Sequence, residues 1–242
     1  MDRNYYDIRY RKNLWDAEYK AKGLPSSFSN RPSTMLKEKL PALIGKDMKS
    51  FLDLGAGMGR NSIYAVEILG FDRAYAIELS EFAVPEGNKQ IVEKGLSGQI
   101  KLIQQSLGEK IDQEDESFDC AVDMMCMHSM LKRDREVMVN EVHRLVRKGG
   151  YMLFNTIAGH SEYKGEKTAY GDLVEKQPAK ENGSYYFEHN GFRYIEKGFT
   201  EEELRVMFDG FEFISLSIDE KFTPAFGDTY KRLYYNGILQ RI

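Results

Sequence analysis

A short apolar run that contains an acid and leads into three evenly spaced glycines constrains this sequence more than any other feature. Residues 51–60 read Phe-Leu-Asp-Leu-Gly-Ala-Gly-Met-Gly-Arg. The run predicts a buried strand, and the glycines predict a tight turn into a following helix. In open α/β sheets, ligands bind beyond the carboxyl ends of the strands, where glycines let the backbone approach closely. The motif therefore indicates an α/β fold with a ligand site directly after this strand.

The spacing of these glycines indicates which ligand the site takes. A dinucleotide-binding loop has its third glycine three residues after the second, and that position is Arg60 in this chain. S-adenosylmethionine has no pyrophosphate for a helix N-terminus to hold, but its α-ammonium suits an acid in this loop, here Asp53. The alternative is an ordinary strand-to-helix turn in which the glycines are coincidental.

A second acid supports the same interpretation. Residues 74–79 predict a strand that ends with Glu78, 25 residues after Asp53. A carboxylate at this position can accept hydrogen bonds from both hydroxyls of a ribose. The alternative is a solvated glutamate at the end of a strand.

The chain as a whole alternates between strands and helices, which predicts a parallel sheet with helices on both faces. A capping box over 200–203 predicts a late helix that ends near Phe208. The predicted strands cover residues 50–54, 74–79, 99–104, 118–125, 151–157, 211–218 and 232–240, and the predicted helices cover residues 60–69, 81–94 and 137–146, the last stopped by Gly149-Gly150.

Residues 159–199 are not required to form the predicted sheet, and a structureless loop of this length is rare in a compact domain. We therefore predict that they form an inserted lid. Asn190-Gly191 lies between two aromatic runs, which is a strong signal for a β-hairpin. A two-residue turn there places Glu188 opposite Arg193 and Phe187 opposite Tyr194, and both pairs are favourable.

The N-terminal 45 residues are polar and aromatic, and they predict helices over 4–21 and 33–43. We expect residues 1–45 to cover the site. The whole chain, residues 1–242, is then a single domain with an N-terminal cover and an inserted lid.

Over residues 50–157 the chain resembles class I S-adenosylmethionine-dependent methyltransferases, in particular the small-molecule kind that includes tellurite-resistance-type enzymes. The matching segments are residues 51–62, 74–80, 117–128 and 141–150, with a weaker match over 199–204. The resemblance implies a doubly wound, Rossmann-like α/β fold whose seven mostly parallel strands follow the order 3-2-1-4-5-7-6, with strand 7 antiparallel. It also implies S-adenosyl-L-methionine as the cofactor.

The motifs and the resemblance together give the candidate cofactor-binding residues. Many relatives carry an acid after strand three that holds the adenine amino group; this chain reads Gln-Gln-Ser-Leu over 104–107, and Ser106 can accept that hydrogen bond. The candidates are Asp53, Gly55, Ala56, Gly57, Gly59, Arg60, Glu78, Leu79, Ser80, Ser106, Leu107, Asp123 and Met124, the last two through backbone groups.

His128 is the candidate catalytic residue. The resemblance places the turn after strand four beside the transferred methyl group, and an imidazole titrates near neutral pH. We favour the alternative, a histidine that packs or bonds the backbone, so an obligatory base is not expected. His143 is expected to be structural, whereas His160 and His189 belong to the lid, where either can meet the substrate.

The composition narrows the class of partner. The formal net charge is -4 and the basic residues form no stripe, so a nucleic-acid partner is not expected. The four histidines with Cys120 and Cys126 make no recognisable metal set. No signal peptide or membrane-length apolar run is present, which predicts a cytoplasmic protein.

We therefore expect a methyltransferase that acts on a small molecule. The turn after strand four lacks the Asn/Asp-Pro-Pro-aromatic motif of amino-group methylases, which disfavours methylation of RNA or DNA. The alternatives are a protein or RNA methyltransferase and a protein that binds the cofactor without chemistry. The sequence does not predict the oligomeric state.

Overall fold

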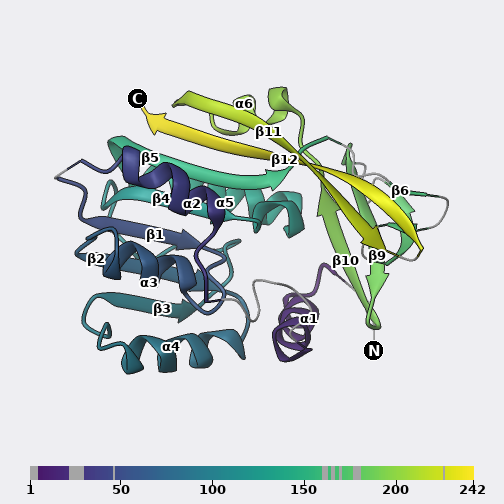
Figure 1. Ribbon diagram of the computed structural model, residues 1–242, viewed down its shortest axis with the longest axis horizontal. Helices are drawn as coiled ribbons and strands as arrows, with labels where there is room; N and C mark the ends of the chain where they lie inside the picture. The colour runs from purple at the N-terminus through teal and green to yellow at the C-terminus, as the bar shows by residue number, and fades with distance from the viewer. Residues whose placement is uncertain are drawn as a thin grey trace.

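The computed structural model describes residues 5–21, 30–45, 47–159, 163–164, 167–168, 171–176, 181–225 and 227–242. Its centre is a seven-stranded sheet in the order β11-β12-β5-β4-β1-β2-β3 (Figure 1). This is the order that the resemblance implied, and β12 runs antiparallel to β5 as expected. The strands are β1 (Ser50–Leu54), β2 (Arg73–Glu78), β3 (Ile100–Gln104), β4 (Phe118–Met124), β5 (Val146–Ile157), β11 (Phe211–Ala225) and β12 (Asp228–Arg241).

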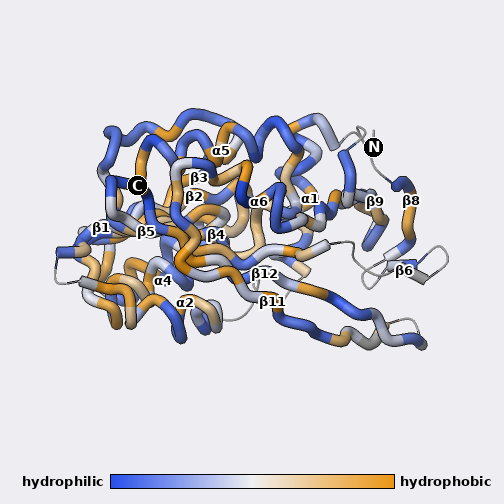
Figure 2. The backbone as a smooth tube through the Cα atoms, turned by 90° about the horizontal axis from the view of Figure 1, so that it is seen from above, coloured by the Kyte–Doolittle hydropathy of each residue, from blue (hydrophilic) through white to orange (hydrophobic). Residues whose placement is uncertain are grey.

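Alternate side chains of the central strands enter two separate cores. Leu52 and Leu54 pack with one cluster, which includes residues of α5 (Lys132–Leu145) and α6 (Glu201–Met207). Phe51 packs with the other, which includes residues of α2 (Thr34–Lys39), α3 (Arg60–Glu67) and α4 (Ala83–Glu93). Figure 2 shows α5 on one side of the strands and α2 and α4 on the other. The sheet is therefore doubly wound, as predicted.

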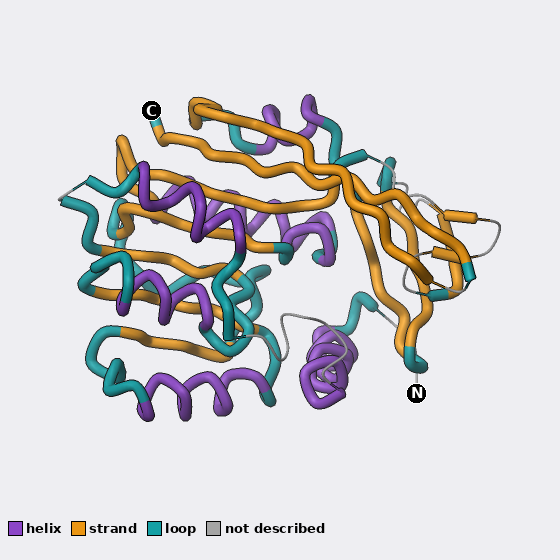
Figure 3. The backbone as a smooth tube through the Cα atoms, in the orientation of Figure 1, coloured by secondary structure: helices purple, strands orange, loops and turns teal. Residues whose placement is uncertain are grey.

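The predicted bounds of three strands were wrong. The helix α5 ends at Leu145, and β5 begins at Val146 and continues through Gly149 and Gly150, so these glycines do not stop the helix. The strands β11 and β12 are longer than the predicted 211–218 and 232–240 because they pair with each other along their whole length. Only Tyr234–Gln240 of β12 also pairs with β5, so the other end of this ribbon extends beyond the central sheet (Figure 3).

The inserted segment contains more strand than the predicted hairpin. The hairpin itself is confirmed: β9 (Ser184–His189) pairs with β10 (Phe192–Lys197), with Glu188 opposite Arg193 and Phe187 opposite Tyr194. With β6 (Tyr163–Lys164), β7 (Lys167–Thr168) and β8 (Asp172–Lys176) it forms a five-stranded sheet. We call β6–β10 the inserted sheet. His160 lies outside the described residues.

The N-terminal helix α1 (Ile8–Ala21) starts later than the predicted residue 4, which is itself outside the described residues. The expected helix over 33–43 is α2 followed by the 3-10 turn Leu40–Ala42. Figure 1 shows α1 between the carboxyl edge of the central sheet and the inserted sheet. None of the helices in the described residues is long and apolar enough to cross a membrane.

Candidate active site

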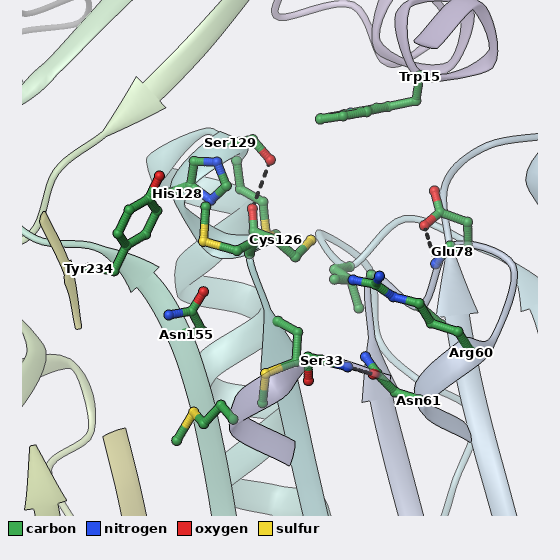
Figure 4. Close-up of a pocket in the computed structure, with 18 of the residues that line it drawn as sticks. Trp15, Ser33, Arg60, Asn61, Glu78, Cys126, His128, Ser129, Asn155 and Tyr234 are labelled. Atoms are coloured by element: carbon green, nitrogen blue, oxygen red, sulfur yellow. Dashed lines mark hydrogen bonds between the residues drawn. The ribbon is translucent and has the colours of Figure 1, made fainter. Parts of the chain in front are cut away.

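A cavity of about 1710 Å³ lies where the carboxyl ends of the parallel strands face α1 and the inserted sheet (Figure 4). The ends of β1, β2 and β4 contribute Gly55, Glu78 and Met124, and the segment after β3 contributes Ser106. The edge predicted from the glycine motif is therefore the edge at which the cavity lies.

The glycine loop lines this cavity with its backbone. Gly55 and Gly57 have φ of 70° and 59°, in the left-handed region that favours glycine. A Cβ on Gly55 would lie 2.5 Å from the Cys126 sulfur, and one on Gly57 would lie 2.7 Å from the Tyr19 hydroxyl. The loop can therefore lie against α1 and the turn after β4 only because these two positions have no side chain.

Glu78 is buried and fastens this loop to the end of β2. Its Oε2 accepts from the backbone N–H of Gly57 at 2.8 Å, and its Oε1 accepts from the backbone N–H of Ser80 at 2.9 Å. The Tyr19 hydroxyl lies 3.5 Å from Oε2. Burial raises the pKa of Glu78, and the two backbone amides partly offset that shift. The Tyr19 contact is long, and a ribose hydroxyl could take its place, so these bonds allow the predicted ribose contact.

Arg60 extends from the start of α3 into the cavity (Figure 4). Its guanidinium has no hydrogen bond or ion pair with any other described residue. Burial lowers its pKa, and the nearby Asp53 partly offsets that shift. A partly buried cation without a carboxylate partner is well placed to receive an anionic group of a ligand.

Four of the predicted binding residues do not line the cavity. Asp53 accepts from the backbone N–H and the hydroxyl of Ser62, at 3.2 and 2.7 Å, and so holds the start of α3. Gly59 is the N-cap of the same helix, with φ of 78°. The other two are Ser80 and Asp123.

The side chains of Ser80 and Asp123 each accept hydrogen bonds from nearby backbone N–H groups. The Ser80 hydroxyl donates to Asp16 at 2.6 Å and accepts from the backbone N–H of Ala83, which ties α1 to the start of α4. The Asp123 carboxylate accepts from the backbone N–H groups of Cys126 and Met127, at 2.8 and 2.9 Å. Burial raises the pKa of Asp53 to about 6 and that of Asp123 to about 7.

The other predicted residues do line the cavity. Ser106 and Leu107 lie on the side where the adenine was expected, and the Ser106 hydroxyl already accepts from the backbone N–H of Gly108 at 3.1 Å. Their contact with a cofactor stays a prediction. The predicted residues in the cavity wall are Gly55, Ala56, Gly57, Arg60, Glu78, Leu79, Ser106, Leu107, Met124 and His128.

His128 lies in the 3-10 turn Met127–Ser129, directly after β4. Burial lowers the pKa of His128 to about 4; Glu196 opposes that shift, and Arg232 adds to it. Its Nδ1 is buried and has no hydrogen-bond partner among the described residues. The imidazole is therefore neutral at pH 7 and presents unused hydrogen-bonding capacity beside the cavity.

The helix α1 closes the cavity through buried polar contacts to both neighbours. Arg11 forms an ion pair with Asp134 at the start of α5. The Tyr194 hydroxyl of the inserted sheet donates to the Glu18 carboxylate. Both contacts hold α1 beside the cavity; that residues 1–45 act as a cover stays a prediction.

The wall of the cavity formed by β5, β11 and β12 was not predicted from the sequence. Asn155, Asp219, Arg232, Tyr234 and Asn236 all line the cavity. Polar residues occupy every second position of 217–223. Because side chains two residues apart share one face of a strand, this alternation could have predicted a strand with one polar face.

Comparison with known proteins agrees with this geometry. Residues 51–150 match the family described as "Methyltransferase domain". No curated protein sequence matches the chain.

Similar solved structures come from several organisms. An S-adenosylmethionine-dependent methyltransferase from Methanosarcina mazei is 21% identical, with a TM-score of 0.68, and the match covers 84% of this chain and 97% of that one. A 1,6-didemethyltoxoflavin-N1-methyltransferase from Burkholderia thailandensis, solved with its substrate and S-adenosylhomocysteine, is 20% identical, with a TM-score of 0.58 and coverage of 95% and 88%. TehB from Haemophilus influenzae is 18% identical, with a TM-score of 0.57 and coverage of 86% and 66%.

Proposed function

We propose that this chain transfers a methyl group from S-adenosylmethionine to a small molecule held in the cavity. The match of residues 51–150 to the methyltransferase domain family supports the proposal. The observation that carries the proposal is the size of the cavity. Small-molecule sites usually measure about 300–1,000 Å³, and this cavity measures about 1710 Å³. It has room for a cofactor and a second small molecule, and α1 and the inserted sheet close it against a macromolecule.

The residues around the glycine loop fit the cofactor. The Arg60 guanidinium, which has no carboxylate partner among the described residues, suits the methionine carboxylate. Glu78 suits the ribose hydroxyls, and the aromatic faces of Trp15 and Tyr19 suit a sulfonium cation. When bound, the cofactor supplies a methyl group that the sulfonium has already activated.

The chain's own residues then have a limited set of tasks. The inserted sheet, which we propose to be a lid, and α1 exclude water from the cavity. The remaining cavity wall orients the acceptor, because alignment of the two reacting atoms is the main requirement of such a transfer. In the described residues, His128 is the imidazole that follows β4. Because its pKa lies near 4, it is a weak base, which suits hydrogen bonding better than proton removal.

We expect His128→Ala to keep S-adenosylhomocysteine affinity unchanged and to retain at least about a tenth of the turnover, since loss of an obligatory base costs about 100- to 10,000-fold. Because the pKa of His128 lies near 4, the imidazole stays neutral from pH 6 to 8, and we expect it to cause no inflection of kcat in that range. His143→Ala, at a histidine of α5 outside the cavity wall, is the matched control. Loss of nearly all turnover in His128→Ala across this pH range would show that the imidazole takes the proton.

An assay of methyl transfer tests the proposed function directly. The full chain is incubated with S-adenosylmethionine and, separately, with pooled small nucleophiles, a peptide pool and total RNA, and S-adenosylhomocysteine formation is measured. The Burkholderia thailandensis neighbour was solved with a small heterocycle, which supports the choice of small molecules. We expect product only with the small molecules. Product only with peptides or RNA, or no product despite cofactor binding, would overturn the proposal in favour of a macromolecular acceptor or of cofactor binding without chemistry.

A further inference from the structure

One face of the ribbon formed by β11 and β12 continues the cavity beyond the central sheet. Strand pairing places Asn236 opposite Asn155 of β5, and Tyr234 opposite Asp219 of β11. Arg232 lies two residues before Tyr234, so its side chain shares the same face. We call Asn155, Asp219, Arg232, Tyr234 and Asn236 the polar wall; all five line the cavity.

The buried cation in the polar wall is neutralised within the protein. The Arg232 guanidinium donates to both carboxylate oxygens of Glu196 in the inserted sheet, at 3.0 and 2.7 Å. The two side chains are only 1% and 3% exposed. A bidentate pair of this kind satisfies both charges, so the buried part of the wall does not call for a charged ligand. The charged Asp219 and Lys221, which also line the cavity, are exposed to solvent.

Away from the exposed Asp219 carboxylate, the polar wall presents one donor and one acceptor whose orientation is fixed by hydrogen bonds. The Tyr234 oxygen accepts from Nε of Arg232 at 3.3 Å, which leaves the phenolic proton for a further partner. The Asn155 amide nitrogen donates to the Asn236 side-chain oxygen at 2.9 Å and to the backbone oxygen of Tyr235 at 3.3 Å. Asn236 in turn donates to Asp219 at 2.9 Å. This chain of bonds orients the Asn155 amide and leaves its oxygen as an acceptor.

In Figure 4 the side chains of Tyr234, His128 and Asn155 lie on the same side of the cavity. The neutral imidazole of His128 also lines the cavity.

Aromatic rings form another part of the same cavity. Phe187 and Tyr194 stack with centroids 5.1 Å apart at 11°, and Trp15 meets Tyr194 edge-on at 6.3 Å. All three line the cavity. Flat aromatic faces beside a polar edge favour a flat ligand that carries its polar atoms on one side.

We propose that the acceptor is an uncharged, flat nitrogen heterocycle whose edge places an N–H beside a carbonyl oxygen. The N–H donates to the Asn155 oxygen, the carbonyl accepts from the Tyr234 hydroxyl, and the ring lies against Trp15, Phe187 and Tyr194. This substrate class rests on the proposed function and refines it.

The test is calorimetric binding of three probes to the full chain saturated with S-adenosylhomocysteine. Carbostyril is a bicyclic lactam with the required edge, N-methylcarbostyril lacks the donor, and naphthoate is a flat anion. We expect carbostyril to bind at least about 5- to 15-fold more tightly than either of the others, the factor that one lost hydrogen bond usually costs.

Variants of the polar wall separate the two contacts. Tyr234→Phe removes only the phenolic donor and is expected to weaken both lactams by about 5- to 15-fold. Asn155→Ala is expected to weaken carbostyril but not N-methylcarbostyril, which has no N–H to lose. Tyr235→Phe is the matched control because Tyr235 points to the opposite face of β12, and it is expected to change neither affinity.

Equal binding of naphthoate and carbostyril, an unchanged affinity in Tyr234→Phe, or no binding of carbostyril would each overturn the substrate class. Failure of the proposed function has a different signature, because it appears as absent S-adenosylhomocysteine binding or as turnover restricted to peptides or RNA.

Discussion

Glu78→Ala is expected to weaken the binding of both S-adenosylmethionine and S-adenosylhomocysteine by about 10- to 150-fold. The carboxylate is positioned to accept two ribose hydroxyls, a contact that should contribute on the order of 1.5–3 kcal/mol. It also accepts from the backbone N–H groups of Gly57 and Ser80, so its removal loosens the loop that forms the floor of the site. Isothermal titration calorimetry with each ligand measures the effect.

The control for this variant is Glu86→Ala, at an exposed glutamate in the first turn of α4. Cofactor affinity should be unchanged there, and thermal unfolding should show that both variants are folded. An affinity in Glu78→Ala equal to that of the wild type would contradict the assignment.

The same carboxylate makes cofactor affinity depend on pH. Burial raises the pKa of Glu78 above its usual range, whereas donation from two hydroxyls favours the charged form and lowers the pKa in the complex. Ligand binding therefore releases a proton as the pH falls toward the raised pKa, and affinity should decrease with acid. Glu78→Ala should lose this part of the pH dependence.

Replacing residues 160–198 with a short Gly-Ser linker is expected to reduce methyl transfer by at least about 100-fold, because a poorly aligned acceptor alone costs that much. A short linker can close the gap, since the backbone N–H of Gly159 donates to the Phe199 oxygen at 2.6 Å. Cofactor binding should persist because the glycine loop and Glu78 are untouched. Transfer to the acceptor identified in the turnover assay is the measurement.

A milder variant separates loss of the lid from loss of the fold. Val174→Ser changes an exposed residue of the inserted sheet, 41% accessible, and should leave transfer unchanged. Tyr194→Ala removes a ring that lines the cavity and should reduce transfer without loss of cofactor affinity. Undiminished transfer by the shortened protein would show that the inserted sheet is a surface feature and not a lid.

Local sequence signals predicted the parts of this fold that local chemistry determines. Asn190-Gly191 predicted the hairpin register, because a two-residue turn with positive φ at both positions leaves little choice of pairing. The capping box at Thr200 and Glu203 is present as predicted. The glycine loop was located correctly because close backbone approach requires residues without a side chain.

The extent of a strand and the direction of a side chain depend on residues far away in the sequence, and local signals did not predict them. The predicted strand over 211–218 stopped short of the charged residues 219–221, yet these residues extend β11 because β12 pairs with them. Ser80 was expected to bind the cofactor, and Asp123 was expected to do so through its backbone. Their side chains bond adjacent backbone groups, as short polar side chains near turns often do. A sequence does not show which way such a side chain turns.

A crystal structure of the full chain with S-adenosylhomocysteine tests the central claim most directly. The account predicts the ligand in the cavity, with its ribose hydroxyls on Glu78, its carboxylate on Arg60 and its sulfur facing the turn that carries His128. The space beside the sulfur should then be bounded by the polar wall and by the inserted sheet. A ligand bound elsewhere, or a ribose that does not contact Glu78, would contradict it.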